Sequence, residues 1–171
     1  MLDFTINQCK MSRLQTLITT FILAIVVAAC GGMADRRLAE AEEIMDNAPD
    51  SALVIIQSIR PSDLRSERSR ALHSLLITQA QSKNYIPIPS DSIIRQTAEY
   101  FDGTSDTRHR MLAHYYLGDV RLELKSYAPA LTAHFEALDL ARELDDKFYI
   151  AMAARGISQI YQDNYLNTIV R

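Results

Sequence analysis

A step of forty residues, combined with helical spacing, most constrains what this chain of 171 residues can fold into. At three points forty residues apart, a large aliphatic residue stands directly before a small one: Ile77-Thr78, Leu117-Gly118 and Ile157-Ser158. Apolar residues elsewhere recur at i, i+3, i+4 and i+7, as they do from Ala52 to Ile59, and this is the spacing of one helix face. No stretch alternates like a strand. A regular step of this size with two helices per step predicts an all-α protein, an α-solenoid of antiparallel helix pairs.

Helix-breaking residues and turn signals divide the chain into a series of predicted helices. The helix that begins near Ala34 is expected to end at Asn47-Ala48-Pro49, with Asp50-Ser51 capping the next. A longer helix is expected over 63–82, followed by an extended segment over 84–89, because each residue before a proline is pushed out of the helical region. Ser90-Asp91-Ser92 is expected to cap a further helix, and Asp145-Asp146 another. The final pair is expected to have a short second helix over 165–171.

The repeating pattern resembles a tetratricopeptide repeat (TPR). Its motif runs W-x2-L-G-x2-Y in the first helix, with spaced alanines and an aromatic residue in the second. Here His114-x2-Leu117-Gly118 is followed by Ala130 and Ala137, and the next repeat reads Ala154-x2-Ile157-Ser158-x2-Tyr161. The chain departs from the motif because it has no Trp, Arg121 replaces the tyrosine, and His134 stands where the aromatic residue belongs. The packing positions of the repeats are Ile77, Thr78, Leu117, Gly118, Ala130, Ala137, Ile157, Ser158 and Tyr161.

The resemblance implies that the first helix of each pair lines a concave face to which peptides bind. In the repeat that matches best, the corresponding positions are Leu112, Tyr115, Asp119 and Leu122. In the next repeat they are Met152, Arg155 and Gln159. Tyr115, Asp119 and Arg155 would hold an extended peptide through stacking and hydrogen bonds. Packing in the core for Leu112 and Met152, and plain surface for the others, is the competing interpretation.

The first thirty residues have the layout of a secretory signal: a basic residue, an apolar run and small residues at its end. The run from Leu14 to Ala29 is about 24 Å long as a helix, which is short of the ~30 Å hydrocarbon core of a membrane. Its end, Val27-Ala28-Ala29-Cys30, resembles the bacterial lipobox, in which the cysteine is lipidated and becomes the new amino end. The sequence therefore predicts a signal peptide over 1–29 (with Met11 as an alternative start), a lipidated linker over 30–35 and a TPR-like domain over 36–171.

A lipobox joined to the helices AEEIMDNAPDSAL (41–53) and SDSIIRQTAEYF (90–101) is similar to a family of bacterial TPR lipoproteins. The family implies a lipid-anchored sensor or scaffold, and we expect a scaffold that mediates protein–protein interaction. The run Gly31-Gly32-Met33-Ala34 lacks an acidic cluster for surface export, so the anchor is expected to face the periplasm, in a membrane that stays open. Two alternatives remain. The chain is the input segment of a truncated membrane-bound transcription regulator, or it is an outer-membrane lipoprotein that binds a ligand such as a glycan.

Residues that would support other chemistry are scarce. A net charge of -3 argues against nucleic-acid binding, which needs a concentrated basic face. His109 and His114 lie five apart, off the spacing that places two metal ligands on one helix face. We therefore expect no catalytic residue, no metal and no cofactor. The basic run Arg108-His109-Arg110 is interpreted as a solvated face. Arginines 60, 65, 68 and 70 suit either a phospholipid headgroup or a solvated face balanced by nearby carboxylates, and the sequence favours the second.

The last repeat is incomplete in this sequence. A repeat of a solenoid cannot bury its apolar face alone. Ile157, Ile160, Tyr161 and Ile169 are therefore expected to be partly open. A longer parent chain, a partner, or self-association through this end would each account for such a face.

Overall fold

The computed structural model describes residues 32–169, and side chains are described as far as Asn164. This part of the chain is all-α. Its helices are α2 (Met33–Ile44), α3 (Pro49–Gln57), a short 3-10 helix η1 (Pro61–Asp63), α4 (Glu67–Lys83), α5 (Ser92–Asp102), α6 (Thr107–Glu123), α7 (Tyr127–Glu143) and α8 (Lys147–Ile169). None of the helices within 32–169 is both long and apolar enough to cross a membrane.

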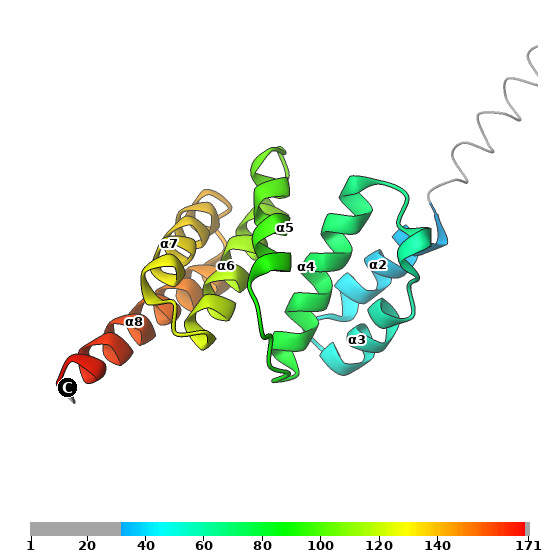
Figure 1. Ribbon diagram of the computed structural model, residues 1–171. Helices are drawn as coiled ribbons and strands as arrows, with labels where there is room; N and C mark the ends of the chain where they lie inside the picture. Colours follow the sequence, from blue (N-terminus) through cyan, green and yellow to red (C-terminus); the bar gives the residue numbers. More distant parts are fainter. Residues whose placement is uncertain (1–31, 170–171) are drawn as a thin grey trace, which may run out of the picture.

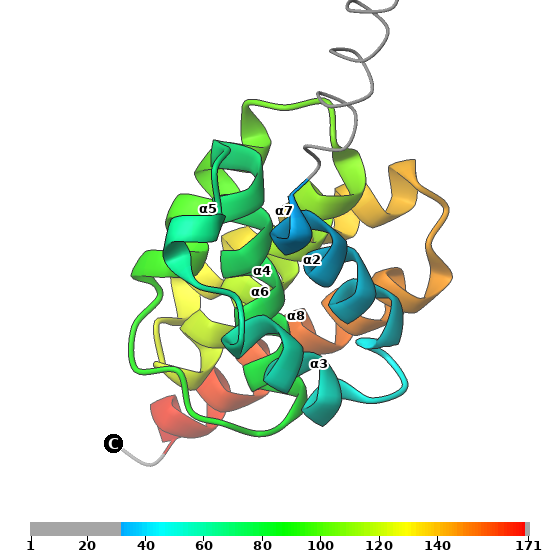
Figure 2. The same cartoon turned by 90° about the vertical axis from the view of Figure 1, so that its right-hand side faces the viewer.

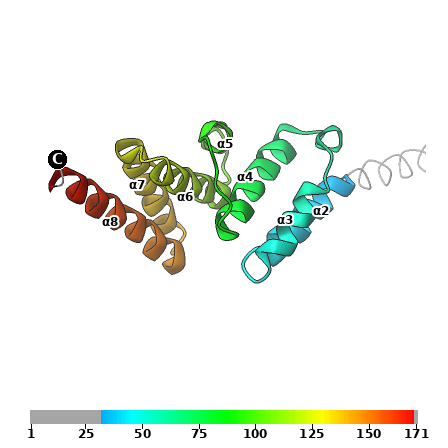
Figure 3. The same cartoon turned by 60° about the horizontal axis from the view of Figure 1, so that its bottom comes forward.

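The helices are arranged in order along the molecule, with α2 and α3 at one end and α8 at the other (Figure 1 and Figure 3). Each helix packs against the next in the chain. In addition α2 contacts α4, α4 contacts α6 and α6 contacts α8. Figure 2 looks from one end and shows the helices behind one another. The even-numbered helices therefore form a continuous layer.

Two apolar cores hold this arrangement, and α4 takes part in both. The first joins α2, α3 and α4 around Leu38, Ile56 and Leu76, which are fully buried. The second joins α5 to α8, with Leu75 of α4 packed against it. Because neighbouring side chains on α4 face different cores, this helix couples the two halves of the molecule.

Some predicted helix boundaries were wrong. α2 begins at Met33, so the last three residues of the expected linker are already helical, and the Gly32 carbonyl accepts from the Asp35 amide at 2.8 Å. α3 begins at Pro49 after Ala48, which leaves the expected Asp50-Ser51 cap inside the helix. α8 continues without a break to Ile169, so the short second helix over 165–171 does not form as a separate element. The cap at Asp146 is confirmed, since its carboxylate accepts from the Tyr149 amide at 3.1 Å.

Three helices end in the same way. Tyr85, Lys125 and Asp145 follow α4, α6 and α7 with φ of 57°, 57° and 53°, in the left-handed region. In each case the next amide reaches back to a carbonyl in the last turn of the helix, as the Ser126 amide does to Arg121 at 2.8 Å. This helix end normally uses glycine. Tyr85 and Lys125 are forty residues apart, so the helix ends follow the same step as the apolar pairs.

The packing positions are mostly buried, with two exceptions. Thr78, Leu117, Gly118, Ala130 and Ala137 are buried, and Ile77 and Ile157 are partly buried. Ser158 and Tyr161 are exposed, and Tyr161 retains 58% of its surface, so their assignment to repeat packing was wrong. Ile160, which was expected to be open, is only 3% exposed because it lies on the inner face of α8.

Candidate functional site

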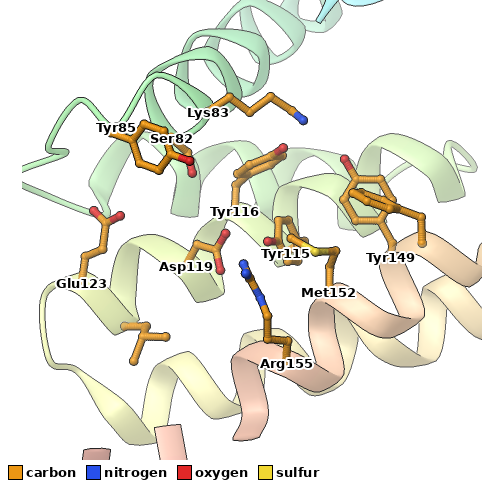
Figure 4. Close-up of a pocket in the computed structure, with 12 residues that line it drawn as sticks. Ser82, Lys83, Tyr85, Tyr115, Tyr116, Asp119, Glu123, Tyr149, Met152 and Arg155 are labelled. Carbon is orange, nitrogen blue, oxygen red and sulfur yellow. The ribbon is translucent and has the colours of Figure 1, made fainter. Parts of the chain in front are cut away.

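An open cleft of about 440 Å³ lies between the end of α4 and the facing sides of α6 and α8 (Figure 4). The end of α4 and the turn after it form one wall, with Ser82, Lys83 and Tyr85. The first part of α8 forms the opposite wall and includes Phe148 and Arg155. The face of α6 that lies between these walls is the floor, and it is largely buried.

Five of the seven residues predicted for the concave face line this cleft: Tyr115, Asp119, Leu122, Met152 and Arg155. The other two, Leu112 and Gln159, do not line it, and for Leu112 the competing interpretation of core packing is the one observed. Leu112 is only 2% exposed, because it lies one turn earlier on α6 where the helix is covered by the second core. Gln159 lies one turn beyond Arg155 and donates to Asp163 of its own helix at 2.8 Å.

Aromatic rings make the floor rigid. The Tyr115 ring meets those of Tyr116 and Tyr149 edge to face, with centroids 5.0 Å and 5.3 Å apart. Tyr116 and Tyr149 share a side-chain hydrogen bond. Burial raises the pKa of all three phenols, that of Tyr149 to about 12. The three hydroxyls therefore stay neutral at any physiological pH and can both donate and accept.

Asp119 and Arg155 bring opposite charges into the cleft. Burial raises the pKa of Asp119 to about 6, while the hydrogen bond from Tyr115 and the charge of Arg155 act in the other direction. Arg155 is exposed, and Figure 4 shows its guanidinium pointing toward Asp119 and Tyr115. The cleft thus presents an acceptor and a donor side by side, an arrangement that can pair with the amide and carbonyl of a peptide bond.

His134 lies beneath this pair and is completely buried. Its Nε2 atom is 3.6 Å from Oδ1 of Asp119, and neither ring nitrogen has a hydrogen-bond partner. Burial lowers the pKa of His134 to about 4, so the ring is neutral at pH 7. The ring lies between Gly118 of α6 and Gly156 of α8, and a Cβ atom at either position would be 2.8 Å or less from it. A buried ring therefore stands at the position where the repeat motif has an aromatic residue.

Several lining residues were missed from the sequence. Tyr85 is 93% exposed and Phe148 is 57% exposed, although both are aromatic. Tyr116 and Tyr149 also belong to the floor. Ser82 could have been found, because it stands forty residues before Leu122. Tyr149 could have been found as well, because it lies three residues before Met152 on the same face of α8.

A second polar cluster joins α2 to α6. His109 is only 8% exposed, which corrects its interpretation as part of a solvated face. Its Nδ1 atom is 2.7 Å from Asp106 and its Nε2 atom is 3.0 Å from Glu42, and these carboxylates raise the pKa of His109 against the effect of burial. Arg68 donates to Asp106 at 2.8 Å. Among residues 32–169, no group of three or more His, Cys, Asp or Glu side chains is placed to hold a metal ion.

Comparisons with known proteins add no relative to this description: no protein-family model, no curated protein and no solved structure matches the chain. A function for this chain must therefore be inferred from its fold and its cleft.

Proposed function

We propose that this chain is a lipid-anchored, TPR-like α-solenoid of the bacterial cell envelope, which binds an extended segment of a partner protein in the cleft between α4, α6 and α8. The packing of each helix on the next, with the even-numbered helices in a continuous layer, supports the solenoid. Stacked helix pairs produce this pattern, because each repeat contacts only its neighbours.

The combination of two exposed aromatic residues with a carboxylate and a guanidinium between them carries the proposal. Tyr85 and Phe148 keep most of their surface exposed on opposite walls, where they offer apolar area to side chains of a bound segment. Asp119 and Arg155 lie between them and offer an acceptor and a donor to its backbone. An extended peptide presents both kinds of group in alternation. Exposed aromatic residues and arginine are also the types enriched at binding sites for proteins.

Selection from a random peptide library displayed on phage tests this function directly. Enriched peptides would be synthesised and measured by fluorescence anisotropy against the wild-type chain, Arg155→Ala and Phe148→Ala. We expect both variants to weaken binding at least about tenfold, since central arginine and aromatic contacts dominate such interfaces. Arg142→Ala is the matched control, because Arg142 is an exposed arginine of α7 paired only with Asp139. Failure to enrich any peptide, or equal binding by all variants, would contradict the proposal.

Lipidation at Cys30, which lies outside the described residues, needs its own test. The chain would be expressed with its signal in a Gram-negative host, and the intact mass of the membrane-extracted protein would be measured. We expect residues 30–171 plus two or three acyl chains. Cys30→Ala should abolish the modification, whereas Cys9→Ala, at the other cysteine, should leave it unchanged. An unmodified full-length chain would contradict the lipoprotein proposal and leave the cleft proposal standing.

A glycan is the second candidate ligand, because the exposed rings of Tyr85 and Phe148 line the same cleft as Asp119 and Arg155. Sugars bind to aromatic faces and to neighbouring acceptors and donors such as Asp119 and Arg155. The same set of variants measured against soluble oligosaccharides distinguishes the two ligands. Binding of an oligosaccharide that is lost in Arg155→Ala, with no peptide enriched, would favour the glycan.

A further inference from the structure

Arginines gather at the end of the molecule where α2 begins. Two lie in the first turns of α2, and four lie between the end of α3 and the first turn of α4: Arg36, Arg37, Arg60, Arg65, Arg68 and Arg70. The same stretches hold only three carboxylates, Asp35, Asp63 and Glu67. These two stretches therefore carry an excess of positive charge, although the rest of α2, the turn after it and the start of α3 are acidic, with Glu40, Glu42, Glu43, Asp46 and Asp50.

Hydrogen bonds bring these two stretches together. Arg37 of α2 donates to the hydroxyl of Ser58 at 3.0 Å, next to the end of α3. Ser69 in the first turn of α4 donates to Asp35 of α2 at 2.5 Å. Figure 1 shows η1 beside the start of α2. The arginines are therefore neighbours in space, although more than twenty residues separate the stretches.

Part of this positive charge is not neutralised. Arg68 forms an ion pair with Asp106, and Arg60 forms one with Asp63. Arg36 and Arg65 are exposed, and within residues 32–169 neither has a carboxylate close enough for an ion pair, although the charge of Arg65 helps to lower the pKa of Asp63. Arg37 and Arg70 bind only neutral groups, the Ser58 hydroxyl and the Leu64 carbonyl. A guanidinium group matches a phosphodiester with two parallel hydrogen bonds, better than a lysine would. We call Arg36, Arg37, Arg65 and Arg70 the arginine face.

The position of this face relative to Cys30 identifies its ligand, and this step rests on the proposed lipidation. Three residues of chain, from Cys30 to Met33, span at most about 11 Å whatever their conformation. A lipid on Cys30 would therefore hold the start of α2 within about 11 Å of the headgroups. This distance is comparable with the Debye length of about 8 Å, so the charges of the arginines would be only partly screened from the headgroups. We propose that the arginine face binds anionic phospholipid headgroups of the membrane that carries the anchor. This contact turns the α2 end toward the bilayer and keeps the cleft, which lies nearer α8, away from it.

A fluorescent reporter can measure this orientation, because the chain contains no Trp. Ser62→Trp places one at the exposed η1, and Tyr161→Trp places one on exposed α8 as the matched control. The lipidated full chain would be reconstituted in vesicles of phosphatidylcholine, alone or mixed with phosphatidylglycerol, that carry a headgroup spin label as quencher. We expect quenching of the Ser62→Trp reporter to rise at least about twofold with phosphatidylglycerol and to fall again at high salt, because the attraction is screened.

Charge removal identifies the residues responsible. Arg36→Gln with Arg65→Gln should abolish the rise, whereas Arg95→Gln with Arg142→Gln, two exposed arginines of α5 and α7, should not. Equal quenching in both lipids, or an unchanged rise in the first pair, would overturn the proposal. A chain that does not float with phosphatidylcholine vesicles at all fails at lipidation. A chain that floats with both kinds of vesicle without the rise fails only at the arginine face.

Discussion

Gly156→Ala tests the packing beneath the cleft. A Cβ atom at position 156 would be 2.5 Å from Cε1 and Nε2 of His134, closer than real contacts allow. The His134 ring cannot move away, because it is fully buried and Gly118 closes its other side. Overpacking of this kind costs about 1–3 kcal/mol. The higher helix propensity of alanine stabilises the native state by about 1 kcal/mol relative to glycine. We therefore expect a net loss of up to about 2 kcal/mol in the free energy of unfolding.

Urea denaturation followed by circular dichroism at 222 nm measures this loss, and the melting temperature should fall by up to about 8 °C. Gly103→Ala is the matched control. Its added Cβ would be 3.5 Å from the Tyr100 carbonyl, an ordinary contact, so we expect no loss.

The decisive comparison is made in a second background. His134→Ala alone should cost about 2–4 kcal/mol, because it leaves a cavity between α6 and α8. The cavity also gives the methyl group of Gly156→Ala room, so in this background the glycine substitution should be neutral or stabilising by up to about 1 kcal/mol. Because the two residues touch, their effects should not add. An equal loss from Gly156→Ala in both backgrounds would refute the role of the ring.

Three further predictions concern charge and backbone strain. Asp119→Asn should raise the free energy of unfolding by about 1–3 kcal/mol at pH 7.5 and by little below pH 4. The reason is that a folded pKa of about 6, above the ordinary 3.8, disfavours the native state only as pH rises. Urea denaturation at both pH values measures this, and an equal gain at both would contradict it. His109→Gln should lower the free energy of unfolding more at pH 6 than at pH 8.5, as measured by urea denaturation at both pH values. A raised histidine pKa stabilises the native state below pH 6.5, and this contribution is lost above the folded pKa, while Glu42, whose pKa is lowered, stays ionised at both. A loss independent of pH would contradict the charged bridge between His109 and Glu42. Lys125→Gly should raise the melting temperature by a few degrees, since relief of a left-handed φ is worth about 1 kcal/mol, whereas Leu124→Gly, at a φ of -76°, should lower it.

The helices could be predicted from the sequence because burial imposes a helical period on apolar residues. The spacing of Ala52, Ile55, Ile56 and Ile59 follows from the packing of α3 against its neighbours. The boundaries could not be predicted equally well. α3 begins at Pro49 without a side-chain cap, which no apolar pattern shows. The continuity of α8 is likewise a property of the backbone.

The cleft was predicted only in part. The floor residues Tyr115 and Asp119 follow from the position of the first helix in each repeat, which the resemblance supplied. The rim residues did not follow. Tyr85 belongs to a turn, and Phe148 to the first turn of α8. They line the same cleft only because α4 and α8 both pack against α6, and such an arrangement is not encoded in local spacing.

Two of the three departures from the repeat motif, Arg121 and His134, are compensated by contacts that a single sequence does not reveal. Arg121, in place of the tyrosine, donates to Asp91 at 2.8 Å and to the Pro129 carbonyl at 3.3 Å, so it ties α6 to the start of α5 and to α7. His134, in place of the aromatic residue, fills the space between two glycines. Because a ring of its size fits only where both neighbouring positions lack a Cβ atom, His134, Gly118 and Gly156 form one packing unit. Any single change within that unit should therefore be costly, while a change of ring and glycine together need not be.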